Sequence, residues 1–226
     1  MSSIRTWLST CSEHKKCSHS LSGKDIRAAG SRSPLRAVSP LPTRCVEVIK
    51  GTGGGWRLQL RLTEEGERGV YVTLSHRWNN ETHPSKTTTQ NVAERMKGRG
   101  FGPMPRLFLD VFRLCSRLGI QFVWIDSLCI IQGDDGDFPA EAVKMADYYQ
   151  YSAFTVANPS ASGPGMGLFD STEQDNSPIP LVRLPYRDTD GQQRGHLYVY
   201  ETERGLTRRY WEGVTKSELL SRGWVF

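Results

Sequence analysis

The stretch Leu118-Gly-Ile-Gln-Phe-Val-Trp-Ile-Asp-Ser-Leu-Cys-Ile-Ile-Gln132 decides the fold of this chain. Residues 120–125 form a short apolar run after a glycine, which predicts a buried strand with Asp126 at its carboxyl end. Residues 105–118, just upstream, carry apolar side chains at helical spacing, with a proline in the first turn and Gly119 as the stop. A helix that leads directly into a buried strand indicates an α/β fold.

Strands and helices alternate on both sides of this stretch. Residues 70–75 are typical of a second buried strand, residues 137–149 of a helix that starts with an Asp cap, and residues 153–157 of a third strand. This order implies right-handed crossovers and a mostly parallel sheet flanked by helices. A further short helix, capped by a threonine, is expected over residues 87–96.

An amino-terminal β-hairpin precedes these elements. Residues 44–49 predict one strand, and residues 56–62 alternate apolar and polar side chains, as in a strand with one wet face. The glycine-rich residues 51–55 between them form a turn, because they lack the Gly-Lys-Ser/Thr ending of a phosphate-binding loop. A carboxyl-terminal extension is expected beyond residue 170, with one or two short strands at 179–184 and 197–200 and a final short helix near 216–220.

The charge of the chain is unevenly distributed. Its formal net charge is +5 over 226 residues, but residues 1–69 hold 12 Lys/Arg against 6 Asp/Glu, and residues 70–226 hold 17 against 18. We therefore expect residues 1–43 to form a basic, serine-rich, largely irregular arm, and residues 44–226 to form the main domain. The basic residues of the arm lack interleaved aromatics, so specific nucleic-acid recognition is not predicted.

Cysteine usage indicates an intracellular protein. The five cysteines are an odd number, and the amino terminus has no apolar segment of signal-peptide length, so reduced thiols and a cytoplasmic location are expected. No apolar run is long enough for a transmembrane segment. Cys11, His14 and Cys17 are weak candidate zinc ligands, but their spacing matches no standard finger, and no metal site is predicted.

Several blocks of the sequence resemble, in order, the blocks of fungal heterokaryon incompatibility (HET) domains. They are Tyr71-Val-Thr-Leu-Ser-His-Arg-Trp78, the stretch that ends at Gln132, Gly167-Leu-Phe169 and Arg222-Gly-Trp-Val225. The resemblance implies a role in non-self recognition and in the induction of programmed cell death. It also implies self-association, or another incompatibility protein as partner. The motif-bearing core spans residues 70–170, and the family pattern continues past Phe226, where we expect the sequence to be truncated.

The first block departs from the family pattern, which usually reads Leu-Ser-Tyr-Cys-Trp-Gly. Here His76, Arg77 and Asn79 stand at three of those positions. If the replaced tyrosine, cysteine or glycine carries chemistry in the family, that chemistry is altered in this chain.

HET domains are in turn similar at long range to Toll/interleukin-1 receptor (TIR) domains, some of which cleave NAD. This similarity implies a TIR-like fold and makes NAD a candidate substrate. In TIR domains a glutamate follows an aromatic residue by three positions on a helix, which is the spacing of Phe138 and Glu141. Such a carboxylate would stabilise an oxocarbenium-like transition state as nicotinamide leaves. The alternative is a solvated glutamate near the start of its helix, beside the buried face rather than within it.

The candidate site lies at the carboxyl ends of the predicted parallel strands, where α/β folds bind ligands. The candidate catalytic residues are Glu141 and Asp126, and the candidate ligand-binding residues are Ser75, Arg77, Trp78 and Gln132. Arg77 could hold a phosphate and Trp78 could stack on a base. Equally, Asp126 could cap the turn that follows it, and Trp78 could simply pack within the domain. A non-enzymatic signalling module therefore remains an alternative to an NAD-cleaving enzyme.

Overall fold

The computed structural model describes residues 4–6, 8, 38–51, 55–78, 82–157, 167–168, 181–187 and 192–200. They divide into two compact units. The first unit reaches residue 158 and includes residues 167 and 168, and the second contains residues 181–187 and 192–200.

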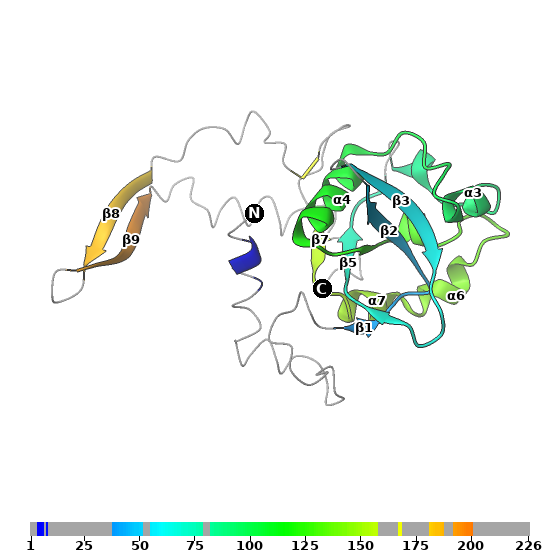
Figure 1. Ribbon diagram of the computed structural model, residues 1–226, viewed down its shortest axis with the longest axis horizontal. Helices are drawn as coiled ribbons and strands as arrows, with labels where there is room; N and C mark the ends of the chain where they lie inside the picture. Colours follow the sequence, from blue (N-terminus) through cyan, green and yellow to red (C-terminus); the bar gives the residue numbers. More distant parts are fainter. Residues whose placement is uncertain are drawn as a thin grey trace. The chain divides into compact units, whose positions relative to one another are not determined.

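A five-stranded sheet organises the first unit, with the strand order β3-β2-β6-β5-β7 (Figure 1). Its strands are β2 (Arg44–Lys50), β3 (Trp56–Leu62), β5 (Tyr71–Ser75), β6 (Phe122–Ile125) and β7 (Thr155–Ala157). Strand β5 pairs in parallel with β6 and β7, whereas β2 pairs antiparallel with both β3 and β6. A separate antiparallel pair joins β1 (Ser39–Pro40) to β4 (Arg68–Gly69).

The prediction of a mostly parallel sheet is confirmed only for β6, β5 and β7. These are the three strands that alternate with helices along the chain, as predicted. The predicted amino-terminal hairpin is confirmed as β2 and β3. However, it extends the sheet itself, because Val46 and Glu47 pair antiparallel with Val123 and Phe122 of β6. Two of the four pairings are therefore antiparallel, and the sheet is mixed.

Helix α4 (Arg106–Leu118) confirms the strongest helix prediction. Gly119 ends it with a φ of +81°, a left-handed conformation that glycine adopts at little cost, and its N–H bonds to carbonyls of the last turn. Pro105 is the N-cap rather than a first-turn residue. The helix packs on β2 and β6.

The other predicted helices are shorter than expected. The single helix predicted over residues 137–149 is two helices, α6 (Phe138–Ala142) and α7 (Met145–Gln150). Helix α3 (Val92–Met96) begins five residues later than predicted and has no threonine cap, because Thr88 instead forms a parallel β-bridge with Gln132. The first unit also contains the short helices η2 (His83–Ser85) and α5 (Asp126–Cys129).

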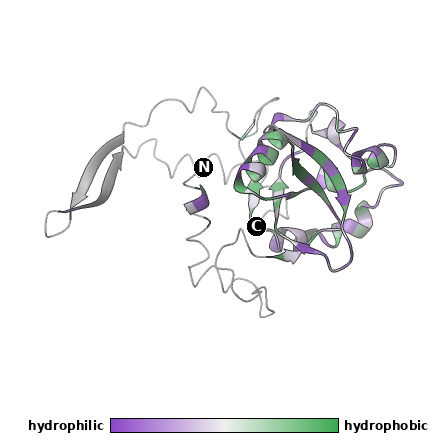
Figure 2. Ribbon diagram, viewed as in Figure 1, coloured by the Kyte–Doolittle hydropathy of each residue, from purple (hydrophilic) through white to green (hydrophobic). Residues whose placement is uncertain are grey.

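The core lies between the central strands and the helices. Val46, Val72, Val123 and Trp124 of the sheet are 0% exposed, as is Phe108 of α4. Apolar residues dominate the central strands, whereas hydrophilic and hydrophobic residues alternate along the hairpin (Figure 2). Within the predicted arm, residues 4–6 and 8 are helical, and the Leu8 side chain joins this core.

Buried thiols make the stability of the domain sensitive to alkaline pH. Burial raises the pKa of Cys115 and Cys129 from 9.0 to about 12. Because the unfolded chain loses these protons first, their contribution is complete below about pH 9 and is lost as the pH rises towards 12. In urea titrations we expect the free energy of unfolding to fall above about pH 9, by up to about 1.4 kcal/mol per pH unit for each thiol. Cys115→Ala should reduce that slope, and an unchanged slope would contradict the assignment.

The second unit contains an antiparallel hairpin of β8 (Leu181–Arg187) and β9 (Gln193–Tyr200). Both strands are longer than predicted. The helix expected over residues 216–220 lies outside the described residues. Among the helices that the structure does describe, none has the length and apolar character needed to cross a bilayer.

Candidate functional site

The carboxyl ends of β5 and β6 meet at Asp126, the residue that follows β6. Leu74 and Ile125 are paired in parallel register, so the loop after β5 begins beside Asp126. The chain leaves β5 through α3 and α4 to reach β6, and leaves β6 through α6 and α7 to reach β7 on the far side of β5. Right-handed crossovers in opposite directions lie on opposite faces of a sheet. The two crossovers separate at the carboxyl ends of β5 and β6. This is therefore the position where α/β folds bind ligands.

The Asp126 carboxylate joins the two loops at this point. Its Oδ2 accepts a hydrogen bond from Trp78 Nε1 at 2.9 Å, and its Oδ1 accepts one from the Ser127 N–H at 2.6 Å. The side chain is 19% exposed. Asp126 therefore bonds the backbone of the following turn, as the structural alternative predicted, and also fixes the indole ring of Trp78.

Two histidines that are not among the candidate residues predicted from the sequence also lie at this site. His76 Nδ1 lies 3.7 Å from Asp126 Oδ1, and the His76 ring meets Phe108 edge to face, with the ring centroids 4.9 Å apart. His83 lies edge-on to Trp78, with 6.1 Å between the ring centroids. The position of His76 directly after a buried strand could have revealed it, whereas no local pattern connects His83 to Trp78.

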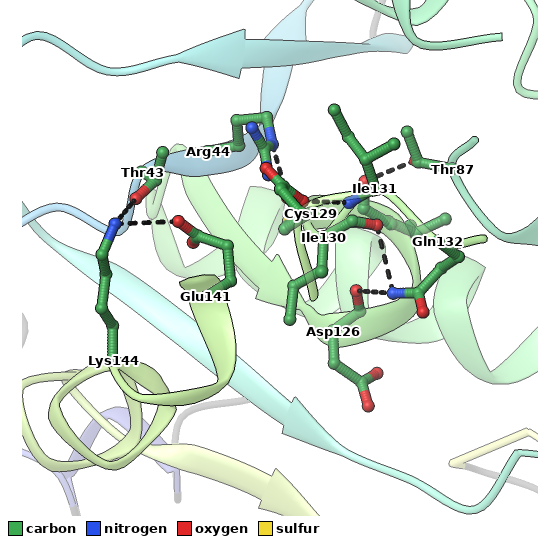
Figure 3. Close-up of polar contacts among 12 residues, drawn as sticks. Thr43, Arg44, Thr87, Asp126, Cys129, Ile130, Ile131, Gln132, Glu141 and Lys144 are labelled. Carbon is green, nitrogen blue, oxygen red and sulfur yellow. Dashed lines mark hydrogen bonds and ion pairs between the residues drawn. The ribbon is translucent and has the colours of Figure 1, made fainter. Parts of the chain in front are cut away.

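Gln132 lies close to Asp126 but bonds to main-chain atoms. Its Nε2 donates to the carbonyl oxygen of Ile130 at 3.2 Å and to that of Asp126 at 3.4 Å. Figure 3 shows its amide directed at these carbonyls and the Asp126 carboxylate pointing away from it. The backbone N–H of Gln132 donates to Thr87 O at 2.7 Å. In this geometry Gln132 shapes the loop after α5.

Asp137 holds the same loop from its other end. Its Oδ1 accepts the Ile131 N–H at 2.8 Å, and its Oδ2 forms an ion pair with Arg44. Arg44 Nε also donates to Cys129 O at 2.7 Å. Asp137 is the N-cap residue of α6, with Pro139 in the first turn, as predicted. Its side chain makes no capping hydrogen bond, because its two oxygens contact Ile131 and Arg44.

Glu141 belongs to a separate cluster beside β2. It is 3% exposed, so the predictions of a solvated side chain beside the buried face are wrong. Its Oε1 lies 2.9 Å from Lys144 Nζ, and its Oε2 accepts a hydrogen bond from Tyr148 Oη at 2.9 Å. Tyr148 Oη and Lys144 Nζ both also contact Thr43 Oγ1. Figure 3 shows Glu141 turned towards Lys144 and away from Asp126.

Lys144 and Tyr148 in this cluster both have raised pKa values. The hydrogen bond to Glu141 raises the pKa of Lys144. Burial is the main cause that raises the pKa of Tyr148, and the nearby Glu141 carboxylate acts in the same direction. Lys144 therefore stays cationic and Tyr148 stays neutral near neutral pH.

The remaining predicted residues lie near Asp126 or outside the described part of the chain. Ser75 ends β5, is half-buried and pairs with Ala157, and Arg77 is exposed. Cys11, His14 and Cys17 fall outside the described residues. Within the described part of the chain, no group of three His, Cys, Asp or Glu residues could hold a metal ion.

Comparison with protein-family models identifies a match over most of the first unit and beyond it. The family model described as "Heterokaryon incompatibility protein (HET)" matches residues 71–226, which is more than half of the chain. No curated protein and no solved structure matches. The matched residues include β5, β6, Asp126 and Glu141.

Proposed function

This chain belongs to the heterokaryon incompatibility (HET) family, and from that membership we propose that it acts in fungal non-self recognition and induces programmed cell death. The site of this function is the Asp126 carboxylate, which is partly exposed between β5 and β6 and bonded to Trp78. A ligand there would meet a fixed negative charge beside an indole ring. The exposed Arg77 could add a cation for a phosphate group.

A TIR-like arrangement is part of this proposal. It is supported by the parallel order β6-β5-β7, with helices between successive strands. The antiparallel hairpin beside β6 is an addition to that core.

The death signal has two candidate forms. The first is cleavage of NAD, for which Asp126 is a better placed carboxylate than Glu141. Asp126 is 19% exposed, whereas both oxygens of the almost fully buried Glu141 contact side chains of the protein itself. The second is a non-enzymatic module that signals by self-association, which the closed Glu141 cluster favours. A weaker alternative to a death signal is binding of nucleic acid or membrane by the basic arm.

Replacement of Asp126 tests the proposed site. Induced expression of the chain in fungal cells should reduce viability, and Asp126→Ala should abolish the effect, because the substitution removes the charge and releases Trp78. Asp126→Asn retains an acceptor without the charge, so it distinguishes electrostatics from positioning. Asp134→Ala, in an exposed loop, is the control and should kill as the native chain does. Survival of cells that express the native chain, or killing by Asp126→Ala at the native level, would overturn the proposal.

The same variants separate the two candidate forms of the signal. Purified chain is incubated with NAD, and nicotinamide release is measured. Turnover that is lost in Asp126→Ala but retained in Glu141→Ala supports an enzyme that acts through Asp126. Killing without NAD loss in cells rules out the enzymatic form and leaves the signalling module.

A further inference from the structure

Arg95 of α3 is a buried cation that has no carboxylate partner among the residues that the structure describes. It is 2% exposed, and its guanidinium carbon lies 5.4 Å from the centroid of the Phe101 ring. Its Nη1 donates to Ser85 O at 2.8 Å and to Thr87 Oγ1 at 2.7 Å, and its Nε donates to Gly100 O at 3.4 Å. All of these acceptors are neutral, and burial lowers the pKa of Arg95. A buried charge without an opposite charge opposes folding, so stability alone is a poor explanation for this arginine.

Thr87, which accepts a hydrogen bond from Arg95, contacts the segment after β6 through three hydrogen bonds. The Thr87 N–H donates to Ser127 O at 2.8 Å, and the Thr87 carbonyl oxygen accepts the Gln132 N–H at 2.7 Å. The Thr87 side chain is 0% exposed, and its Oγ1 donates to Leu128 O at 2.6 Å. Because a guanidinium can only donate, Thr87 Oγ1 must accept from Arg95, and its single proton is left for Leu128 O.

The segment after β5 is thus joined to the segment after β6 at two points. At its start Trp78 bonds the Asp126 carboxylate, and at its end Thr87 bonds residues that follow Asp126. Between these points lies η2, which packs on α5 and whose first residue meets the Trp78 ring edge-on. Arg95 bonds both Thr87 and Ser85, the last residue of η2. One buried side chain therefore holds the second joint and the turn beside the first.

We propose that Arg95 is a positioning residue for the candidate site at Asp126. Through Thr87 it sets the position of α5, whose first residue is Asp126, and through Ser85 it sets the position of η2. The indole N–H of Trp78 and the Asp126 carboxylate then meet at hydrogen-bond distance. This inference deepens the proposed function by naming a residue that the site needs at a distance, and in its role in cell death it rests on that function.

The indole N–H of Trp78 reports this positioning in proton–nitrogen NMR spectra of the purified chain. The chain contains six tryptophans, so the Trp78 resonance is assigned as the one that is absent in Trp78→Phe. Asp126→Ala removes the acceptor and gives the position of the resonance without its hydrogen bond. The chemical shift is measured on the folded chain, so a lower free energy of unfolding does not by itself move the resonance.

Arg95→Met should move the Trp78 resonance most of the way to its position in Asp126→Ala, because methionine fills the apolar space but donates no hydrogen bond. Arg99→Met is the matched control. It makes the same substitution at an exposed position after α3 and should leave the resonance in place. An unmoved resonance in Arg95→Met, or an equal movement in Arg99→Met, would overturn the proposal.

Thr87 provides a second test, which applies even where Arg95→Met does not fold. Thr87→Val keeps the shape of the side chain but loses the hydroxyl, so it should move the resonance in the same direction, whereas Thr87→Ser keeps the hydroxyl and the native position. Ile120→Ala is the control for stability, since Ile120 is 4% exposed and lies at the opposite end of β6 from Asp126, and it should not move the resonance. A native resonance in Thr87→Val, or an equal shift in Ile120→Ala, would contradict the inference.

The spectra do not measure cell killing, so failure of this inference and failure of the proposed function are distinguishable. If Arg95→Met moves the resonance and still kills at the native level, the positioning role stands and Asp126 is not the site of the death signal. If the resonance does not move, the positioning role fails, whatever Asp126→Ala does to killing.

Discussion

Trp124→Ala is expected to lower the free energy of unfolding by about 3–5 kcal/mol, the cost typical of deleting a large buried aromatic side chain. Trp124 is 0% exposed in β6, which pairs with strands on both sides. Its ring centroid lies 5.4 Å from those of Tyr148 and Tyr149 on α7. Truncation would leave a cavity between sheet and helix that the strand cannot close, because its backbone is held by both neighbours.

Urea unfolding of Trp124→Ala, Trp124→Phe and Phe138→Ala measures this effect. Trp124→Phe retains an aromatic ring and should cost less than the alanine variant. Phe138 is 48% exposed, so Phe138→Ala should change the free energy of unfolding by about 1 kcal/mol or less. A loss below about 1 kcal/mol for Trp124→Ala would mean that β6 is not the centre of the core.

Asp137→Ala is expected to cost about 2–3 kcal/mol, less than the loss for a fully buried ion pair because Asp137 is 31% exposed. The substitution leaves the Arg44 guanidinium, which is only 7% exposed, without its carboxylate. It also removes the acceptor of the Ile131 N–H. The loop that carries Gln132 should therefore loosen, and its amides should exchange with solvent faster.

Thermal or urea unfolding, together with hydrogen exchange, checks this result. Asp134→Ala is the matched control, since it removes an exposed carboxylate from the same loop and should change stability by about 0.5 kcal/mol or less. Asp137→Asn keeps an oxygen for Ile131 but loses the charge, so it should lie between the other two. Equal stabilities of Asp137→Ala and Asp134→Ala would exclude the structural role of the ion pair.

Much of the fold follows from local patterns. The helical spacing of apolar residues before Gly119 predicts α4, because burial of one helix face requires that period. The apolar run before Asp126 predicts β6, because a strand that is covered on both faces needs apolar side chains at successive positions. These patterns do not specify which strand lies beside which, so the antiparallel pairing of β2 with β6 could not be predicted from them.

The candidate site shows the same division. The position of Asp126 at a strand end was predictable, as was the nearness of Trp78 through the loop after β5. The burial of Glu141 was not, because it depends on Tyr148 in the next helix and on Thr43, which directly precedes the distant strand β2. The break between α6 and α7 has no proline or glycine to mark it.

The sequence by itself determined the family, the order of the main strands and helices, and the location of Asp126 at the end of a buried strand. Periodicity and turn chemistry encode these features within short windows. Only the tertiary structure decided that the hairpin joins the sheet, that Asp126 bonds Trp78, and that Glu141 is closed off by its neighbours. Such contacts join residues far apart in the chain, and they form where the packing of the whole domain brings complementary polar atoms together.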